Sequence, residues 1–431
     1  MGDYTMKARL LAAAMGAATV LGGGNAFAAD LGGNCCADLE ERIAELEATT
    51  ARKGNRKVSL TITGWVSSQL YWFDDGAESN VYVVDNNNDL SSNVKFTGSA
   101  QISPGWKAGY SLWIYTNGPS SLGTNADNWS TAANKAWGLQ TENSYWFIQS
   151  DTLGKLSVGK QSLAADNAAL GTDFSGTLFP ANGVTFDGGA LAVNINGVNS
   201  GAAWLNVAFW CEHVGVGIAN DCAGGRLNGV RYDTPTFAGF TLGALWGEDD
   251  YWDIALRYSG EFSGFKLAFA TAYSESTDPN ILGTPIAGTN DNQYFQVGGM
   301  IKHLASGLWV HGTYGENFID GAGRKDITGY YIKAGWTSKF SHLGNTHFYG
   351  EYGKNEDAFS TQPGAGQIFG VQVTDSDATR YGVGVVQEID AAAMSLWAKW
   401  RHHELDGTLA NGATFEADDV DMFLAGAVIF Y

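Results

Sequence analysis

The sequence predicts an all-β fold, a sixteen-stranded antiparallel β-barrel that spans a membrane. First, about sixteen segments alternate between apolar and polar residues, as Met394–Arg401 does, and such strands have one apolar and one polar face. Second, after the N-terminal segment no stretch approaches the roughly 18 uninterrupted apolar residues that a transmembrane helix needs. Third, tight turns alternate with long loops, as the two ends of an up-and-down barrel require.

The first 28 residues are predicted to be a signal peptide. Lys7 and Arg9 give a positive start, Leu10–Leu21 is an apolar run, and Ala26–Ala28 is a small-residue cleavage site. The apolar run is too short to span a bilayer. An uncleaved N-terminal anchor is the alternative interpretation. Such a signal peptide would direct the chain out of the cytoplasm and be removed from the mature protein.

Residues 29–57 are expected to form a periplasmic segment that contains one short helix. Within Ala37–Arg52, Leu39, Ile43 and Leu46 follow helical spacing, with acidic residues between them. Two turns of heptad spacing are too few for a stable isolated coiled coil. Copies tethered to one oligomer could nevertheless pair through this stripe, and a solvated, frayed helix is the alternative.

Composition favours an exported β-protein. The chain has 57 Gly, 15 Trp, 18 Tyr and 22 Phe but only 16% charged residues, a combination that is rare in helical globular proteins. The formal net charge of −20 disfavours nucleic acid or an anionic surface as a partner. Most acidic clusters fall between predicted strands, which is typical of solvated loops.

The barrel is predicted to occupy residues 58–431. Its sixteen strands lie near Val58–Leu70, Val94–Ile102, Trp106–Tyr115, Ser144–Ser150, Lys155–Lys160, Leu227–Asp233, Phe240–Trp246, Tyr251–Glu261, Phe265–Tyr273, Tyr294–His303, Leu308–Tyr314, Gly329–Phe340, Thr346–Tyr352, Arg380–Ile389, Met394–His402 and Asp419–Tyr431. Two further candidates, Ala190–Asn196 and Trp204–Trp210, lie in a long insert after Lys160, and we assign both to that insert.

The connectors predict how the barrel is oriented. Sixteen strands need seven tight turns and eight longer loops when both termini lie on the tight-turn side, which in an outer membrane is the periplasm. A soluble sandwich or propeller has no reason to place all its long loops at one end. The tight connectors are Ser103–Gly105, Thr152–Gly154, Pro235–Gly239, Phe262–Gly264, Leu304–Gly307, Ser341–Gly344 and Asp390–Ala393.

Aromatic residues cluster at the strand ends, as at Tyr71–Phe73, Trp246 and Phe430–Tyr431. Amphipathic rings prefer the boundary between lipid and water. Packing between two sheets is the alternative, and it explains the number of rings but not their placement.

Basic side chains predict a water-filled lumen because they fall on the polar face of their strands. A cation on the lipid face near mid-membrane costs about 2 to 4 kcal/mol, whereas one in a wet lumen costs little. Lys107, Lys266 and Lys302 adjoin tight turns and are expected at the periplasmic rim. The deeper cations are the candidate pore-lining residues: Arg231, Arg257, Lys333, Arg380, Lys399 and Arg401.

The insert after Lys160 is predicted to narrow the channel, because sixteen strands alone enclose a wide aqueous bore. Its first part, Ser162–Gly189, carries Asp166, Asp173 and Asp187. Folded inward, these carboxylates would face the lumen cations and produce a transverse field, as charged rings do in other channels. Ordinary solvation of loop acids is the alternative.

The cysteines fall into two groups. Cys211 and Cys222 bracket a Gly-rich loop, and we predict a disulfide bond between them in an exported chain. Cys35 and Cys36 are adjacent, so a bond between them would be strained. We assign them no role.

Two rival functions are weighed against a general channel. An outer-membrane enzyme needs a nucleophile or paired acids near a base, and no histidine neighbours a Ser and an Asp in such a motif. His402 and His403 point to opposite faces of a strand, so we expect no shared metal and no cofactor. A sugar-selective channel would carry lumen aromatics, and candidates with lumen parity are Trp65, Tyr71, Trp113, Tyr115, Trp309 and Trp397.

In the order of its motifs, the chain resembles the alpha-proteobacterial porin family. Besides the signal peptide, the motifs are Cys36–Arg42, Arg56–Val58, Leu153–Lys160, Val230–Pro235 and Val428–Tyr431. The resemblance covers essentially the whole mature chain. It implies a homotrimer of sixteen-stranded barrels in outer-membrane lipid, a third loop folded into each pore, and passive diffusion of small hydrophilic solutes and ions. It also implies that the terminal aromatic, here Tyr431, forms part of the assembly signal, although the family more often ends in Phe.

Overall fold

The computed structural model describes residues 57–86, 90–126, 138–181, 187–211, 213, 221–247, 250–277, 292–319, 325–362 and 364–431. The predicted signal peptide, the N-terminal helix, Cys35 and Cys36 lie outside the described residues. Among the residues that are described, no helix has the length and hydropathy needed to cross a bilayer.

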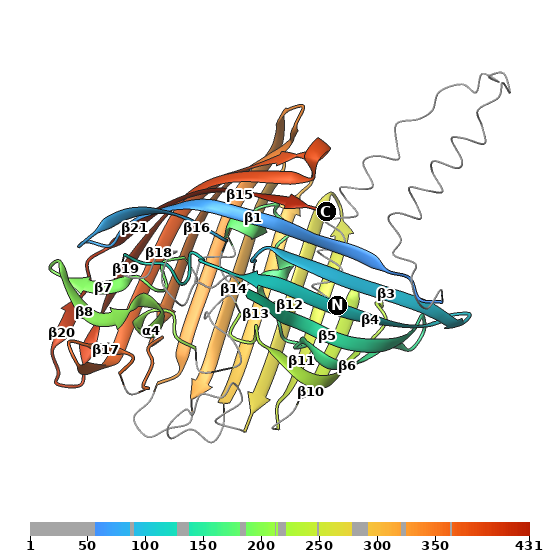
Figure 1. Cartoon of the computed structure of the whole chain (residues 1–431), viewed down its shortest axis with the longest axis horizontal. Coiled ribbons are helices and arrows are strands. Elements are labelled where there is room, and N and C mark those ends of the chain that lie inside the picture. The colour runs from blue at the N-terminus through green and yellow to red at the C-terminus, as the bar shows by residue number, and fades with distance from the viewer. Residues whose placement is uncertain are drawn as a thin grey trace.

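Sixteen antiparallel strands form a closed barrel (Figure 1). Each strand pairs with the next, and the last pairs with the first through ten residue pairs from Trp65↔Phe430 to Asp74↔Asp421. The barrel strands are β1 (Thr61–Asp74), β3 (Asn93–Ser103), β4 (Trp106–Asn117), β5 (Gly138–Ser150), β6 (Gly154–Ser162), β9 (Arg226–Asp233), β10 (Phe240–Gly247), β11 (Trp252–Phe262), β12 (Phe265–Ser276), β13 (Asn292–His303), β14 (Leu308–Ile319), β15 (Ile327–Ser341), β16 (Gly344–Glu356), β18 (Val371–Ile389), β19 (Met394–Leu409) and β21 (Val420–Phe430). All sixteen predicted strands are confirmed.

Shorter elements lie in the connections. Strand β2 (Ser79–Val84) pairs with the second half of β1, while β3 pairs with its first half, so β2 and β3 follow one another along β1. Strands β17 (Gln367–Ile368) and β20 (Thr414–Glu416) are short pieces of long loops. The 3₁₀ turn η4 (Asp390–Ala392) fills one of the tight connectors.

The tight turns occur where the sequence predicts them. Pro104 and Gly105 connect β3 to β4, and Gly105 has a φ of 77°. Ser263 and Gly264 connect β11 to β12 with φ angles of 49° and 81°. Glycine adopts this left-handed region without the steric penalty that a side chain brings, which explains why each of these two turns contains one.

The outer surface of the barrel is a belt of apolar side chains. Along β11 and β12, for example, Ile254 and Phe269 point outward and are 40% and 42% exposed, while inward-facing Ala255 and Ala270 are 1% exposed. The same alternation gives exposed Leu242, Ile301, Val310, Ile332, Phe348, Val383 and Phe423 on other strands. The predicted two-faced character of the strands is therefore confirmed.

The insert between β6 and β9 departs from the prediction in one element. It contains η2 (Leu170–Thr172), α3 (Leu178–Ala181), the hairpin strands β7 (Ala192–Ile195) and β8 (Val198–Ala203), and α4 (Trp204–Val207). The first predicted insert strand is confirmed, but the second, Trp204–Trp210, is wrong. Asn196 and Gly197 both have positive φ, 52° and 75°, as a two-residue type I′ turn requires. The second hairpin strand therefore begins at Val198 and ends where α4 starts.

Candidate functional site: the loop-lined interior of the barrel

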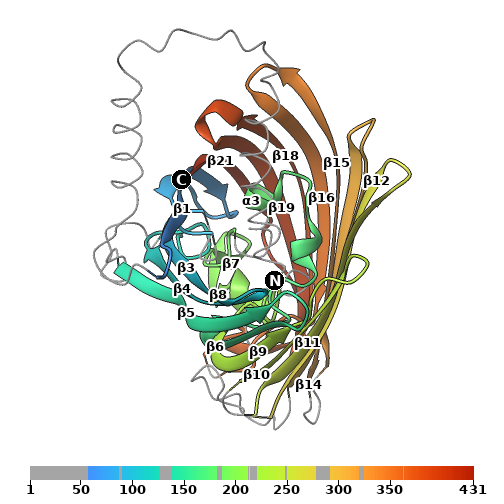
Figure 2. The ribbon, with the colours of Figure 1, turned by 90° about the vertical axis from the view of Figure 1, so that its right-hand side faces the viewer.

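The insert lies inside the barrel, where Figure 2 shows α3, β7 and β8 between opposite walls. Its first part runs along the inner wall from strand to strand. The amide of Ala165 donates to Asp253 Oδ2 on β11 at 2.7 Å, and the amide of Ala169 donates to Gln296 Oε1 on β13 at 2.8 Å. Thr172 then hydrogen-bonds His311 on β14 at 3.1 Å.

The start of the insert is held by two of the predicted cations. Arg231 donates from Nη1 to the carbonyl oxygens of Ser162 and Leu163 at 3.0 and 2.9 Å, and its Nη2 pairs with Asp233 at 2.9 Å. Arg257 donates to the carbonyl oxygen of Ala164 at 2.5 Å. These guanidinium groups supply the donors that the irregular backbone of the insert would otherwise lack.

The three predicted carboxylates of the insert all contact basic side chains. Asp166 lies 3.0 Å from Arg226, a cation of β9 that the sequence analysis did not single out. Asp173 lies 2.5 Å from Lys333 on β15, and both side chains are almost fully buried. Asp173 therefore faces a predicted wall cation, and Asp187 does so as well.

Asp187 joins two wall cations of β19. Its Oδ2 accepts hydrogen bonds from Lys399 at 2.5 Å and from Arg401. Arg401 also donates from Nε to Glu351 on β16 at 2.6 Å, and Lys399 donates to the carbonyl oxygen of Pro180 in α3 at 2.6 Å. This network attaches the part of the insert that contains Pro180 and Asp187, which we call its tip, to the wall.

Asp173 and Asp187 remain ionised despite their burial. Burial alone would raise the pKa of Asp173, but the ammonium of Lys333 outweighs it and holds the pKa well below the usual range. Burial likewise opposes ionisation of Asp187, and Lys399 and Arg401 together lower its pKa. Opposite charges in direct contact largely cancel at a distance, so these pairs attach the insert rather than project a strong field across a gap.

Arg380 is the sixth predicted wall cation, and it too lies against the insert. Its guanidinium carbon is 5.2 Å from the ring centroid of Phe209. The expected rim lysines are accessible to solvent: Lys107 is exposed, and Lys266 and Lys302 are half-buried. Lys266 lies 4.6 Å from the ring centroid of Phe174.

The lumen aromatics pack together instead of lining an open path. Trp65, Trp113 and Trp397 are buried around Phe179 of α3, with ring centroids 5.8 Å apart for Trp65–Phe179 and 5.7 Å apart for Phe179–Trp397. Trp113 joins the cluster through Trp65, with ring centroids 6.0 Å apart. These three residues therefore do not form a row of exposed rings along which a sugar could bind.

The C-terminal part of the insert leads back to β9, and we call it the return part. It contains the predicted disulfide bond, Cys211–Cys222. Beside it, His213 hydrogen-bonds Ser274 at 2.7 Å and Asn292 at 3.1 Å. Burial lowers the pKa of His213 to about 4, so the ring is neutral at physiological pH.

Several partners in the interior were not predicted from the sequence, among them Asp233, Glu351 and His213. Asp233 and Glu351 share the lumen parity of the cations, so the same alternation test applied to acids would have found them. No sequence signal marks His213. His402 and His403 lie on opposite faces, as expected, and among the residues described no three His, Cys, Asp or Glu gather as a metal site would require.

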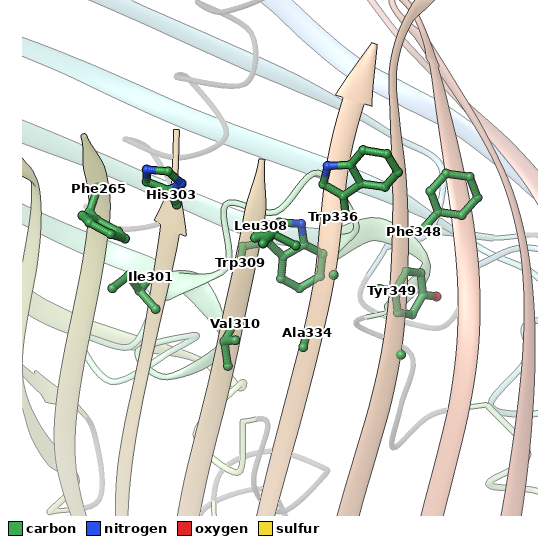
Figure 3. Close-up of a pocket in the computed structure, with 12 residues that line it drawn as sticks. Phe265, Ile301, His303, Leu308, Trp309, Val310, Ala334, Trp336, Phe348 and Tyr349 are labelled. Carbon is green, nitrogen blue, oxygen red and sulfur yellow. The ribbon is translucent and has the colours of Figure 1, made fainter. Parts of the chain in front are cut away.

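A separate pocket of about 660 Å³ lies outside the lumen (Figure 3). It is formed mostly by outward-facing side chains near the tight-turn end, including Ile301, Val310, Trp336 and Phe348, and Ala334 and Gly350 leave the space between them. Its position on the apolar belt separates it from any path through the barrel.

Comparisons with known proteins agree with this architecture. The family model described as Gram-negative porin matches residues 12–408. A search of curated protein sequences finds no match.

Solved structures match over most of the chain, and at these low identities the likeness shows the fold. The anion-selective porin from Comamonas acidovorans is 15% identical, with a TM-score of 0.55, and the match covers 87% of this chain and 100% of the porin. A loop L8 deletion mutant of OmpT, an outer membrane protein of Vibrio cholerae, is 12% identical with a TM-score of 0.52, covering 87% and 100%. Salmonella typhi OmpF, in complex with daunomycin, is 11% identical with a TM-score of 0.50, covering 88% and 99%. With its closed sixteen-stranded barrel and its family match over most of the sequence, the chain belongs to the Gram-negative porins, channels for passive diffusion in the bacterial outer membrane.

Proposed function

We propose that solutes and ions pass between the insert and the wall formed by β3, β4 and β5. The insert's polar contacts described above lie on strands from β9 through β19. The opposite wall presents small polar side chains inward, among them Thr97 and Ser99, together with Lys95. The observation that carries the proposal is the position of the insert's ion pairs, Lys333–Asp173 and the Asp187 network, on the wall from β9 to β19. On the other side the insert makes aromatic and backbone contacts instead, as Phe179 does with Trp65 and Ala190 with Leu122.

In this proposal the deeper wall cations and the insert carboxylates predicted from the sequence form the charged side of the constriction. Contact pairing makes most of them nearly neutral as seen by a passing ion, so the rim lysines Lys266 and Lys302 contribute more to ion selectivity. Their ammonium groups would favour anions at the periplasmic mouth. The deeper pore-lining set is Arg231, Arg257, Lys333, Arg380, Lys399 and Arg401, with Asp166, Asp173 and Asp187.

The test is the reversal potential of purified protein in a planar bilayer under a KCl gradient. The variant Lys266→Glu/Lys302→Glu is expected to shift the reversal potential toward cation selectivity. Asp187→Asn/Lys399→Met is the matched control, because it removes one charge of each sign and should leave the sign of selectivity unchanged. An unchanged potential in the rim variant would place these lysines off the permeation path.

We further propose that three copies associate, that outer-membrane lipid covers the apolar belt, and that the chain is exported by residues 1–28. The finer placement in the alpha-proteobacterial branch, with a periplasmic helix in residues 29–57, is supported by the order of sequence motifs. Native mass spectrometry of detergent-purified protein tests the stoichiometry, and a purely monomeric species would contradict it. N-terminal sequencing of the mature protein tests cleavage after Ala28.

A further inference from the structure

Arg380 is a buried cation with few partners. It lies on β18 with 1% of its surface exposed. Its Nη2 donates to Asn355 Oδ1 at 2.8 Å, while Nε and Nη1 have no hydrogen-bond partner within the part of the chain that the structure describes. Arginine cannot lose its proton in a protein. Its charge therefore persists in this buried position.

The charged groups around Arg380 do not neutralise it. Glu351 on β16 accepts hydrogen bonds from Arg401 at 2.6 Å and from Tyr331 at 2.7 Å, and Asp187 is bound by Lys399 and Arg401. In this cluster of described residues, two carboxylates face three cations: Arg380, Lys399 and Arg401. One positive charge is left over, and the geometry assigns it to Arg380.

Aromatic side chains of the insert close over this charge. The ring centroid of Phe209 lies 5.2 Å from the Arg380 guanidinium carbon, and that of Trp204 lies 6.1 Å from Phe209. His403, the register partner of Arg380 on β19, has its ring centroid 5.4 Å from Phe209 and 5.8 Å from Trp204. All four side chains are 1% exposed. The group is closed to bulk solvent.

Two side chains of this buried group carry further N–H donors without acceptors: Asn355, which accepts from Arg380, and Trp204, whose ring contacts Phe209 and His403. Trp204 Nε1 and Asn355 Nδ2 have no hydrogen-bond partner among the described residues. Both groups can only donate, and buried donors in proteins are nearly always paired. Gly353, which faces Arg380 on β16, has no side chain, and a Cβ there would lie 2.9 Å from Arg380 Nε. The glycine gives the guanidinium room to lie along the wall.

We propose that Arg380, Asn355 and Trp204 form an enclosed binding site for a small monovalent anion, such as a halide or a short carboxylate. Such an anion accepts hydrogen bonds from N–H donors and neutralises the remaining positive charge. The aromatic walls exclude water, which strengthens the attraction. The site lies behind the insert, apart from the proposed diffusion path, so its anion holds the return part of the insert against β18.

Bromide is a direct probe, because its anomalous scattering identifies it in crystals of the full-length protein grown in sodium bromide. We expect one ordered bromide beside Arg380 in the wild type and in Lys333→Met, a control that removes another buried wall cation. We expect none in Arg380→Met. No bromide beside Arg380 in the wild type, or an equally occupied bromide in Arg380→Met, would overturn the proposal.

A solution measurement covers the case in which Arg380→Met fails to fold. Thermal unfolding of the detergent-purified wild type is followed while chloride replaces gluconate at constant ionic strength. A ligand that binds only the folded state raises the unfolding temperature saturably. Trp204→Phe keeps the aromatic wall but loses one donor, so it should need several-fold more chloride for half the effect. A chloride effect that does not saturate, or is unchanged in Trp204→Phe, would contradict the site.

Discussion

Replacing Asp187 with Asn should release the tip of the insert from the wall. In the wild type, one Asp187 oxygen binds both Lys399 and Arg401, and all three side chains are 1% exposed or less. Arg401 keeps Glu351 as a charged partner in the variant, but Lys399 keeps no carboxylate in contact among the described residues and donates only to neutral oxygens such as the carbonyl of Pro180. Removing one partner of a buried ion pair costs about 3 to 5 kcal/mol. Since about 1.4 kcal/mol is tenfold, the released state should become roughly two to nearly four orders of magnitude more populated.

Hydrogen exchange measures this release because local opening sets the exchange rate of protected amides. The relevant amides include Leu191, which donates to Gly188, and Ala190, which donates to Leu122. We expect their exchange to accelerate strongly in Asp187→Asn and much less in Asp187→Asn/Lys399→Met, which leaves no unpaired ammonium.

A surface pair provides the matched control. Lys325 and Asp375 are 51% and 47% exposed, and exposed pairs contribute about 0 to 1 kcal/mol. Asp375→Asn should therefore leave exchange in the insert unchanged. If Asp187→Asn exchanged as slowly as the wild type, the ion-pair network would not be what attaches the insert.

Three further predictions concern the belt, the disulfide bond and His213. Ile332→Arg on the apolar belt should destabilise the folded protein in lipid by about 2 to 4 kcal/mol, and Thr97→Arg in the lumen by much less; equal losses in urea unfolding from vesicles would contradict the assignment of faces. Cys211→Ser/Cys222→Ser should loosen the return part of the insert by about 2 to 3 kcal/mol, and reduced wild type should match the variant in protease sensitivity. Because the pKa of His213 falls from 6.5 to about 4 on folding, the unfolded chain binds more protons between these values, and stability should decrease as pH falls through that window. His213→Gln should flatten the dependence of the unfolding temperature on pH, and an unchanged dependence would contradict the role given to His213.

The alternation of side chains made the barrel predictable. A period of two along a strand decides which residues face hydrocarbon, and the energetic penalty for a cation on that face placed Lys333, Lys399 and Arg401 inward. The turns were equally predictable from the sequence, because Gly105 and Gly264 mark positions that need a positive φ. Asn196–Gly197 carried the same kind of signal, and applying it would have started the second hairpin strand correctly, at Val198.

The interior contacts could not be read from the sequence. Asp187 and Lys399 are 212 positions apart, and no local pattern indicates which loop carboxylate meets which wall cation. Burial also depends on how the insert packs: Arg380 has the same parity as the other cations, yet Phe209 covers it. The expected electric field across the channel followed from the signs of the charges alone. Because Asp173 and Asp187 contact their cations directly, these charges largely cancel, and the pairs attach the insert to the wall instead.

The conductance of single channels tests the central claim most directly, namely that the barrel encloses water and crosses the membrane. Purified protein in a planar bilayer should produce discrete current steps whose size rises in proportion to the bulk conductivity of KCl, because ions would then move through a water-filled path. Absence of current steps, or a conductance that stays constant as the salt concentration increases, would contradict it.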